Sequence, residues 1–166
     1  MPTIAHLDDL YKPIEDELDD VRAEIAGLWT DVLRLVNVDA DAVSRVGGKL
    51  LRPAMCLLSA GAIGDTRLER YVPMATAMEL FHMAALAHDD VIDEARMRRG
   101  NVSLNAMWDN HTAVLGGDYL VARGIGVLAG YGSCDVVSNA VDCIRQMAEG
   151  ELVDLDRKST RLNSSH

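Results

Sequence analysis

Cysteine is scarce in this 166-residue sequence, and basic residues are outnumbered by acidic ones. The three cysteines, Cys56, Cys134 and Cys143, form no C-x-x-C pair, which argues against a disulfide framework or zinc site and favours reduced, buried thiols. Sixteen Lys and Arg against 26 Asp and Glu give a net charge of −10, so no nucleic-acid partner is expected.

Long apolar runs and a basic leader are also missing. The apolar stretches are interrupted before they reach the roughly 18 residues of a membrane span, so no transmembrane segment is expected. The N-terminal segment PTIAHLDDLYKPIEDELDD is acidic where a targeting sequence is basic, and a cytoplasmic location is therefore expected.

The hydrophobic pattern predicts an all-α protein, with no convincing strand and no internal repeat. A content of 49% hydrophobic residues is enough to fill one core at this chain length. Helices are expected at about residues 6–36, 39–46, 51–62, 68–94, 103–109, 111–130 and 134–155.

The most informative segment is the run DDVID at residues 89–93, which is followed by Arg98-Arg99-Gly100. If residues 71–94 are helical, Asp89 and Asp93 stand one turn apart on one face, with Cβ atoms about 5–6 Å apart. Mg²⁺ is usually held by one or two carboxylates together with phosphate oxygens. The segment therefore predicts a magnesium-held diphosphate, with arginines offsetting the charge repulsion.

An exposed acidic helix end is the alternative reading of this run. The preceding residues favour the metal site, because residues 74–92 read as an apolar helix rich in Ala and Met. The aspartates then end a largely buried segment, and buried carboxylates need partners or metals.

A basic segment, GGKLLRP, lies upstream at residues 47–53. Lys49 and Arg52 are three residues apart and share a helical face, so together they can clamp a second anion. Gly47 and Gly48 allow a close backbone approach, and Pro53 suits the first turn of a helix. The alternative is a loop that enters a helix and carries two solvated basic residues.

These motifs together resemble the polyprenyl synthetase family of trans-isoprenyl diphosphate synthases. GGKLLRP, His82, DDVID and RRG occur in that family's order and at closely similar spacings, from about residue 10 to Leu155. The resemblance covers the family's N-terminal half. It implies an isoprenoid-synthase-type helical bundle truncated to that half, with residues 1–155 forming the N-terminal part of the domain, and a homodimer when the protein is full length.

The resemblance also implies a role for each matching residue. Asp89 and Asp93 would ligate the Mg²⁺ ions that bridge to an allylic diphosphate, with Asp90 supporting them and Arg98 contacting the same diphosphate. These four are the implied catalytic residues. A lone histidine on an apolar helix is otherwise most simply a core residue. The implied binding residues for isopentenyl diphosphate are Lys49, Arg52, His82 and Arg99.

Product length is suggested by the residues before the aspartates. In the family, the positions four and five residues before the first aspartate line the pocket floor, and here they are Ala85 and Ala84. Small residues leave the floor open, which favours a medium- or long-chain trans-polyprenyl diphosphate of the kind used for quinone side chains. Two alternatives remain open: the alanines simply allow close helix packing, or the enzyme is a short-chain (C15 or C20) synthase.

The last eleven residues, DRKSTRLNSSH at 156–166, match the translation of a common sequencing adapter codon for codon. We therefore expect residues 156–166 to be an adapter-derived, disordered tail. The family's second aspartate-rich motif is absent from the chain, so the fragment itself is expected to be inactive.

Two other classes of protein compete with a prenyltransferase. A noncatalytic partner subunit of a heteromeric synthase would usually lack the aspartate motifs, which are intact here. A terpene cyclase would share the fold and an aspartate cluster but would not need the isopentenyl site formed by Lys49, Arg52 and Arg99.

Overall fold

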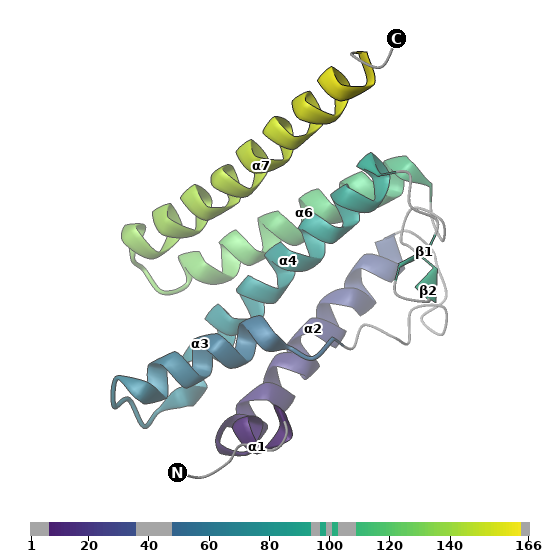
Figure 1. Ribbon diagram of the computed structural model, residues 1–166. Coiled ribbons are helices and arrows are strands. Elements are labelled where there is room, and N and C mark those ends of the chain that lie inside the picture. The colour runs from purple at the N-terminus through teal and green to yellow at the C-terminus, as the bar shows by residue number, and fades with distance from the viewer. Residues whose placement is uncertain (1–6, 36–47, 94–96, 99–100, 103–108, 164–166) are drawn as a thin grey trace. The chain divides into compact units, whose positions relative to one another are not determined.

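The computed structural model describes residues 7–35, 48–93, 97–98, 101–102 and 109–163, and these residues are predominantly helical (Figure 1). The expected all-α class is therefore confirmed. The chain divides into two compact units, residues 1–127 and 128–166. The first unit contains all the predicted site residues.

The N-terminal helical stretch consists of α1 (Leu7–Tyr11), the 3₁₀ turn η1 (Lys12–Ile14) and α2 (Glu15–Leu35). Buried residues recur every three or four positions along it, which is the spacing of one helical face. This face packs against α4 (Val72–Ile92). Its buried side chains are Ile14, Leu18, Val21, Ile25, Leu28 and Val32.

Helix α4 is the central element of the first unit, because α2 and α3 (Leu51–Ala62) both pack against it (Figure 1). A 3₁₀ turn, η3 (Leu68–Tyr71), leads into α4, so the single helix expected at about 68–94 is two elements. Small side chains dominate the buried part of α4, including Ala75, Ala77, Ala84 and Ala87. They let neighbouring helices approach α4 closely.

Helix α6 (Asn110–Ala129) is preceded by Asp109, whose Oδ1 accepts a hydrogen bond of 2.8 Å from the Thr112 amide. This is an N-cap contact. A Cβ built on Gly124 would lie 2.5 Å from Cε1 of Phe81 on α4, and one on Gly117 would collide with the His88 imidazole. The two helices therefore touch at glycines, which leave room for the rings.

Among the described residues, α6 is also long and apolar enough, by length and composition alone, to cross a membrane. The sequence reading expected no such segment. In the structure 28% of its apolar window is buried, and the face that carries Gly117 and Gly124 contacts α4.

The structure adds a short antiparallel pairing that the sequence did not predict. Strands β1 (Met97–Arg98) and β2 (Asn101–Val102) pair with Met97 opposite Val102 and Arg98 opposite Asn101. Two-residue strands are too short to leave an alternating pattern. The helices expected at 39–46 and 103–109 lie outside the described residues, apart from Asp109.

The second unit consists mainly of α7 (Cys134–Asn163), which continues well past Leu155. The helix therefore runs beyond the end expected near residue 155, whereas the adapter-derived origin and the disorder of residues 156–166 stay predictions; residues 164–166 lie outside the described residues. No glycine or proline interrupts residues 151–163, and basic residues near the helix end suit its macrodipole. Cys134 and Cys143 are exposed rather than buried as expected, and all three cysteines are free.

The glycine contacts on α6 predict opposite effects of two alanine substitutions. Gly124→Ala should lower the free energy of unfolding by about 1–3 kcal/mol, because its methyl group overpacks the Phe81 ring. Gly126→Ala is the matched control, since nothing lies within 4 Å of its Cβ position, and it should raise stability by about 0.5–1 kcal/mol. Urea unfolding followed by circular dichroism measures both. Equal effects would contradict the close α4–α6 packing.

Candidate functional site

The aspartate run forms the C-terminal end of α4. The Asp93 amide donates a 2.8 Å hydrogen bond to the carbonyl oxygen of Asp89, so these residues are one helical turn apart, as the spacing predicted. Asp90 is buried with 5% of its surface exposed, Asp89 is half-buried and Asp93 is exposed. The two expected metal ligands thus lie on one face, while Asp90 points into the protein.

The position of these carboxylates is electrostatically unfavourable for the bare helix. The C-terminal end of a helix carries partial negative charge and favours cations. Helix α4 has no basic residue in its last turn. Three carboxylates here therefore repel the helix end, and a bound cation would relieve that repulsion.

Asp89 and Asp93 have the chemistry that Mg²⁺ requires, since both are hard oxygen donors. Within the part of the chain that the structure describes, no three His, Cys, Asp or Glu side chains converge into a metal-binding cluster. The pair would therefore need further oxygen ligands, and diphosphate oxygens are of the right kind.

The basic segment has an unusual backbone. Leu50 adopts φ 47° and ψ 39°, the left-handed region, although its side chain is buried with 6% exposed. For a residue other than glycine this conformation costs about 1–2 kcal/mol. The Tyr11 hydroxyl donates a 2.7 Å hydrogen bond to the Lys49 carbonyl oxygen. The Tyr11 hydrogen bond therefore fixes the turn that carries Lys49, and Arg52 follows in the first turn of α3; both side chains are exposed.

A buried carboxylate, Glu79 of α4, lies behind this turn and was missed by the sequence reading. Its side chain is 8% exposed, and its Oε1 lies 3.7 Å from the Cβ position of Gly48. Oε2 is buried and has no hydrogen-bond partner. Burial raises the pKa of Glu79, and the charge of Arg52 partly opposes that shift. The available signal was an acidic residue inside an apolar helical stretch.

Two histidines of α4 precede the aspartates. His82 is half-buried and lies seven residues before Asp89, as expected. His88 was not predicted: its Nε2 lies 3.2 Å from the Val114 carbonyl oxygen and 3.4 Å from Asp118 Oδ1. These contacts attach the turn that carries Asp89 to α6.

The structure describes three of the four remaining predicted residues, Ala84, Ala85 and Arg98. Ala84 belongs to the hydrophobic core with 1% exposed, which favours the packing alternative for that position, whereas Ala85 is partly exposed. The backbone of Arg98 lies in β1. Arg99 lies outside the described residues.

Described residues of the first unit line at least two pockets. One of about 490 Å³ is lined by Arg52 and otherwise mostly by apolar residues. Its other lining residues are Met55, Cys56, Ser59, Ala60, Ile63, Tyr71, Met74 and Met78. An arginine beside an apolar surface suits an amphiphilic anion.

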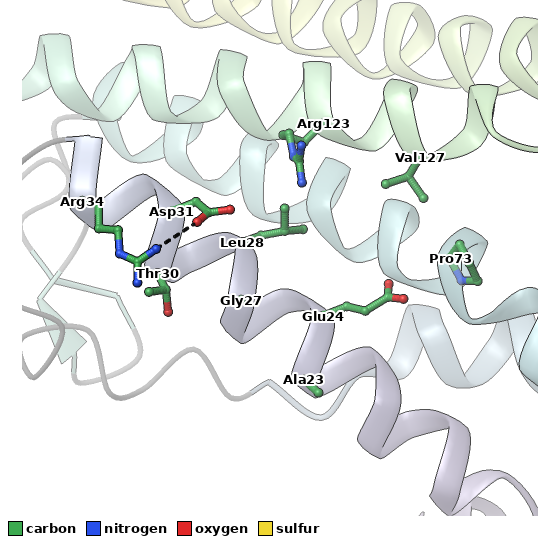
Figure 2. Close-up of a pocket in the computed structure, with 10 residues that line it drawn as sticks. All are labelled: Ala23, Glu24, Gly27, Leu28, Thr30, Asp31, Arg34, Pro73, Arg123 and Val127. Carbon is green, nitrogen blue, oxygen red and sulfur yellow. Dashed lines mark ion pairs between the residues drawn. The ribbon is translucent and has the colours of Figure 1, made fainter.

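The second pocket, of about 630 Å³, lies among α2, α4 and α6 (Figure 2). Charged side chains of both signs line it, and Arg34 forms a 3.7 Å ion pair with Asp31. None of the predicted site residues contributes to it, so its volume does not identify it as the chemical site.

Comparison with known proteins gives a consistent result. The polyprenyl synthetase family profile matches residues 35–166. An all-trans-nonaprenyl-diphosphate synthase (geranyl-diphosphate specific) from Rhodobacter capsulatus is 40% identical over 129 residues, which are 78% of this chain and 39% of that protein. Component 2 of the heptaprenyl diphosphate synthase of Geobacillus stearothermophilus is 37% identical over 153 residues, or 92% and 45% of the two chains.

Solved structures agree. The crystal structure of a polyprenyl synthase from Caulobacter crescentus CB15, complexed with calcium and isoprenyl diphosphate, has a TM-score of 0.79 and 30% identity. The match covers 93% of this chain and 47% of that one. The chain thus spans less than half the length of the relatives described here.

The fold and the site together define an all-helical protein of the isoprenoid-synthase type, with carboxylates and basic side chains suited to diphosphates. The chain belongs to the polyprenyl synthetase family. The two relatives described above are named for nonaprenyl and heptaprenyl diphosphate synthesis. One crystallised relative holds a divalent cation, calcium, together with isoprenyl diphosphate.

Glu79 predicts how stability should depend on pH. Its pKa is raised in the folded protein, so the folded state holds this proton more tightly than the unfolded state. The resulting stability is fully present below the unfolded pKa of about 4.3 and is lost as pH rises through the folded pKa. Glu79→Gln should therefore raise the free energy of unfolding at pH 7 by about 1 kcal/mol. Urea unfolding of both proteins across pH 4–8 checks this, and a destabilised variant at pH 7 would contradict it.

Proposed function

We propose that the full-length protein containing this chain is a Mg²⁺-dependent prenyltransferase that condenses isopentenyl diphosphate with an allylic diphosphate to make a medium- or long-chain trans-polyprenyl diphosphate. The observation that carries the proposal is that α4 ends in three carboxylates, while a strained turn that carries Lys49 leads into α3 and its Arg52. The names of the relatives support the same reaction.

The proposed roles follow the family's motifs. The carboxylates of Asp89 and Asp93 would hold Mg²⁺, and buried Asp90 would keep that end of α4 in place. When bound, Mg²⁺ would supply positive charge to the leaving diphosphate. Arg98 would contact the same diphosphate. Guanidinium groups suit this role because they can bind phosphate oxygens bidentately.

The second substrate would be held by the basic turn. Lys49 offers a point charge and Arg52 a planar fork, and His82 and Arg99 would complete the set. Ionisation breaks the allylic C–O bond, and diphosphate leaves with the electron pair. The double bond of isopentenyl diphosphate then attacks the carbocation, and the released diphosphate takes up the proton that is lost. The basic side chains act by placing fixed charge where negative charge develops.

Two alternative functions remain testable. A noncatalytic partner subunit of a heteromeric synthase would bind an active subunit and incorporate no substrate itself. A short-chain synthase would stop at C15 or C20. This alternative stays open because Ala84 packs in the core, so its small side chain need not indicate an open pocket floor.

The activity test uses the full-length gene product with radiolabelled isopentenyl diphosphate, farnesyl diphosphate and Mg²⁺, with products resolved by chain length. Mg²⁺-dependent polyprenyl products are expected, and the 166-residue chain alone should incorporate none. Asp89→Asn should lower turnover by about 10²–10³-fold, the loss typical of removing one preformed electrostatic contact. No incorporation by a folded full-length protein would favour the partner subunit.

Product length is tested at Ala85, which is more accessible than Ala84. Ala85→Phe should shorten the products to about C15–C20, because a ring would fill space that the growing chain needs. Ala85→Ser keeps the side chain small and should leave the length unchanged. Long products from Ala85→Phe would show that position 85 does not limit elongation.

A further inference from the structure

Helices α4 and α6 meet at two matched contacts between a ring and a glycine. Phe81 of α4 lies against Gly124 of α6, and His88 lies against Gly117, so the rings and the glycines are each two helical turns apart. The two helices are therefore antiparallel at this contact, in one register. A Cβ on either glycine would collide with the ring that faces it, so each ring fits because α6 has no side chain there.

The second contact is polar as well as steric. His88 Nε2 lies 3.2 Å from the carbonyl oxygen of Val114 and 3.4 Å from Oδ1 of Asp118. A carbonyl oxygen only accepts hydrogen bonds, so Nε2 of a neutral His88 ring carries the proton and donates it. The Phe81 ring has no such donor. A directional bond at His88 therefore fixes the rotation of α4 about its axis as well as its register against α6.

This contact lies next to the two expected metal ligands. His88 precedes Asp89, and the Asp93 amide closes the same turn by its hydrogen bond to the Asp89 carbonyl oxygen. Helix ends fray readily, and this one carries carboxylates and no basic residue in its last turn. Mg²⁺ demands near-ideal octahedral geometry, so a small rotation of the helix end would cost affinity. The His88 contact is placed where it would prevent that rotation.

We propose that His88 is a positioning residue for the metal site: its Nε2–H, bonded to the Val114 carbonyl oxygen, orients the Asp89–Asp93 pair before Mg²⁺ binds. This inference rests on the proposed function and deepens it, because it assigns part of the metal affinity to the backbone of α6. His88 acts through the aspartate turn and is not itself a ligand.

The test measures binding of radiolabelled farnesyl diphosphate to the full-length protein by equilibrium dialysis over a series of Mg²⁺ concentrations. Isopentenyl diphosphate is left out, so no condensation occurs. His88→Leu should raise the Mg²⁺ concentration for half-maximal binding about tenfold, the lower end of the loss seen when a group that supports metal ligands is removed. The amount bound at saturating Mg²⁺ should not change. Loss of bound ligand without a shift in the Mg²⁺ midpoint would overturn the inference.

His88→Gln is the conservative variant. A glutamine side chain also carries N–H donors and can reach the Val114 carbonyl oxygen, although it lacks the ring. It should keep the Mg²⁺ midpoint within about threefold of the parent protein. Both variants lose the packing of the imidazole, so a purely structural role predicts the same midpoint for both, and that result would contradict the proposal.

The two glycines of α6 provide a matched pair of variants. Gly117→Ala would displace the His88 ring and should raise the Mg²⁺ midpoint about tenfold. Gly124→Ala would displace the Phe81 ring, two turns away from the aspartates, and should leave the midpoint within about twofold even though it also overpacks the α4–α6 contact. Equal midpoints would show that general packing between the helices sets the affinity, and the inference would fail.

The same titration separates this inference from the proposed function. If the parent protein bound farnesyl diphosphate without any dependence on Mg²⁺, the proposed metal role would be wrong and the inference would fail with it. If the parent required Mg²⁺ and His88→Leu had the same midpoint, only the role of His88 would be overturned.

Discussion

The burial of α4 is the constraint on which the first unit depends. Helices α2, α3 and α6 all contact it, and its small side chains let them come close. The same helix ends in three carboxylates and carries Glu79 in its buried part. Because its flanks are fixed by packing, the polar groups at its end are held in place without needing to stabilise one another.

The close contact between α4 and α6 explains how the end of α4 is kept rigid. Gly124 of α6 accommodates the Phe81 ring of α4. Two turns further along α4, the His88 ring packs against Gly117 of α6, and its imidazole also contacts Val114 and Asp118. His88 is the residue before Asp89, so the fixed imidazole limits how far the aspartate turn can move. A flexible end would lose its preorganisation toward a cation, which reduces the benefit of placing charges there.

Much of the fold could be predicted from the sequence because the helices are amphipathic or uniformly apolar and have clear ends. The range 51–62 agrees with α3, and 111–130 differs from α6 by one residue at each end. The spacing of Asp89 and Asp93 placed them on one face because helical geometry is local. Glu79 and His88 were missed because their importance comes from neighbours distant in sequence, Gly48 and Arg52 for one and α6 for the other. Helix α7 runs beyond the end expected near residue 155, because residues 151–163 contain no glycine or proline that would end it.

The charges at two helix ends are opposite to those that stabilise a helix. The N-terminal end of α3 has no acidic residue in its first turn and carries Arg52 there, whereas the C-terminal end of α4 carries aspartates and no basic residue. Each arrangement disfavours the isolated helix. Each also concentrates charge of one sign where it would stabilise an oppositely charged ligand. The helix dipole and Arg52 would attract an anion to the start of α3, and the dipole and carboxylates of α4 would attract a metal ion to its end. A metal-bound diphosphate offers both charges at once. Selection for stability alone would have removed both sets of charges, so their presence together argues for binding rather than for folding.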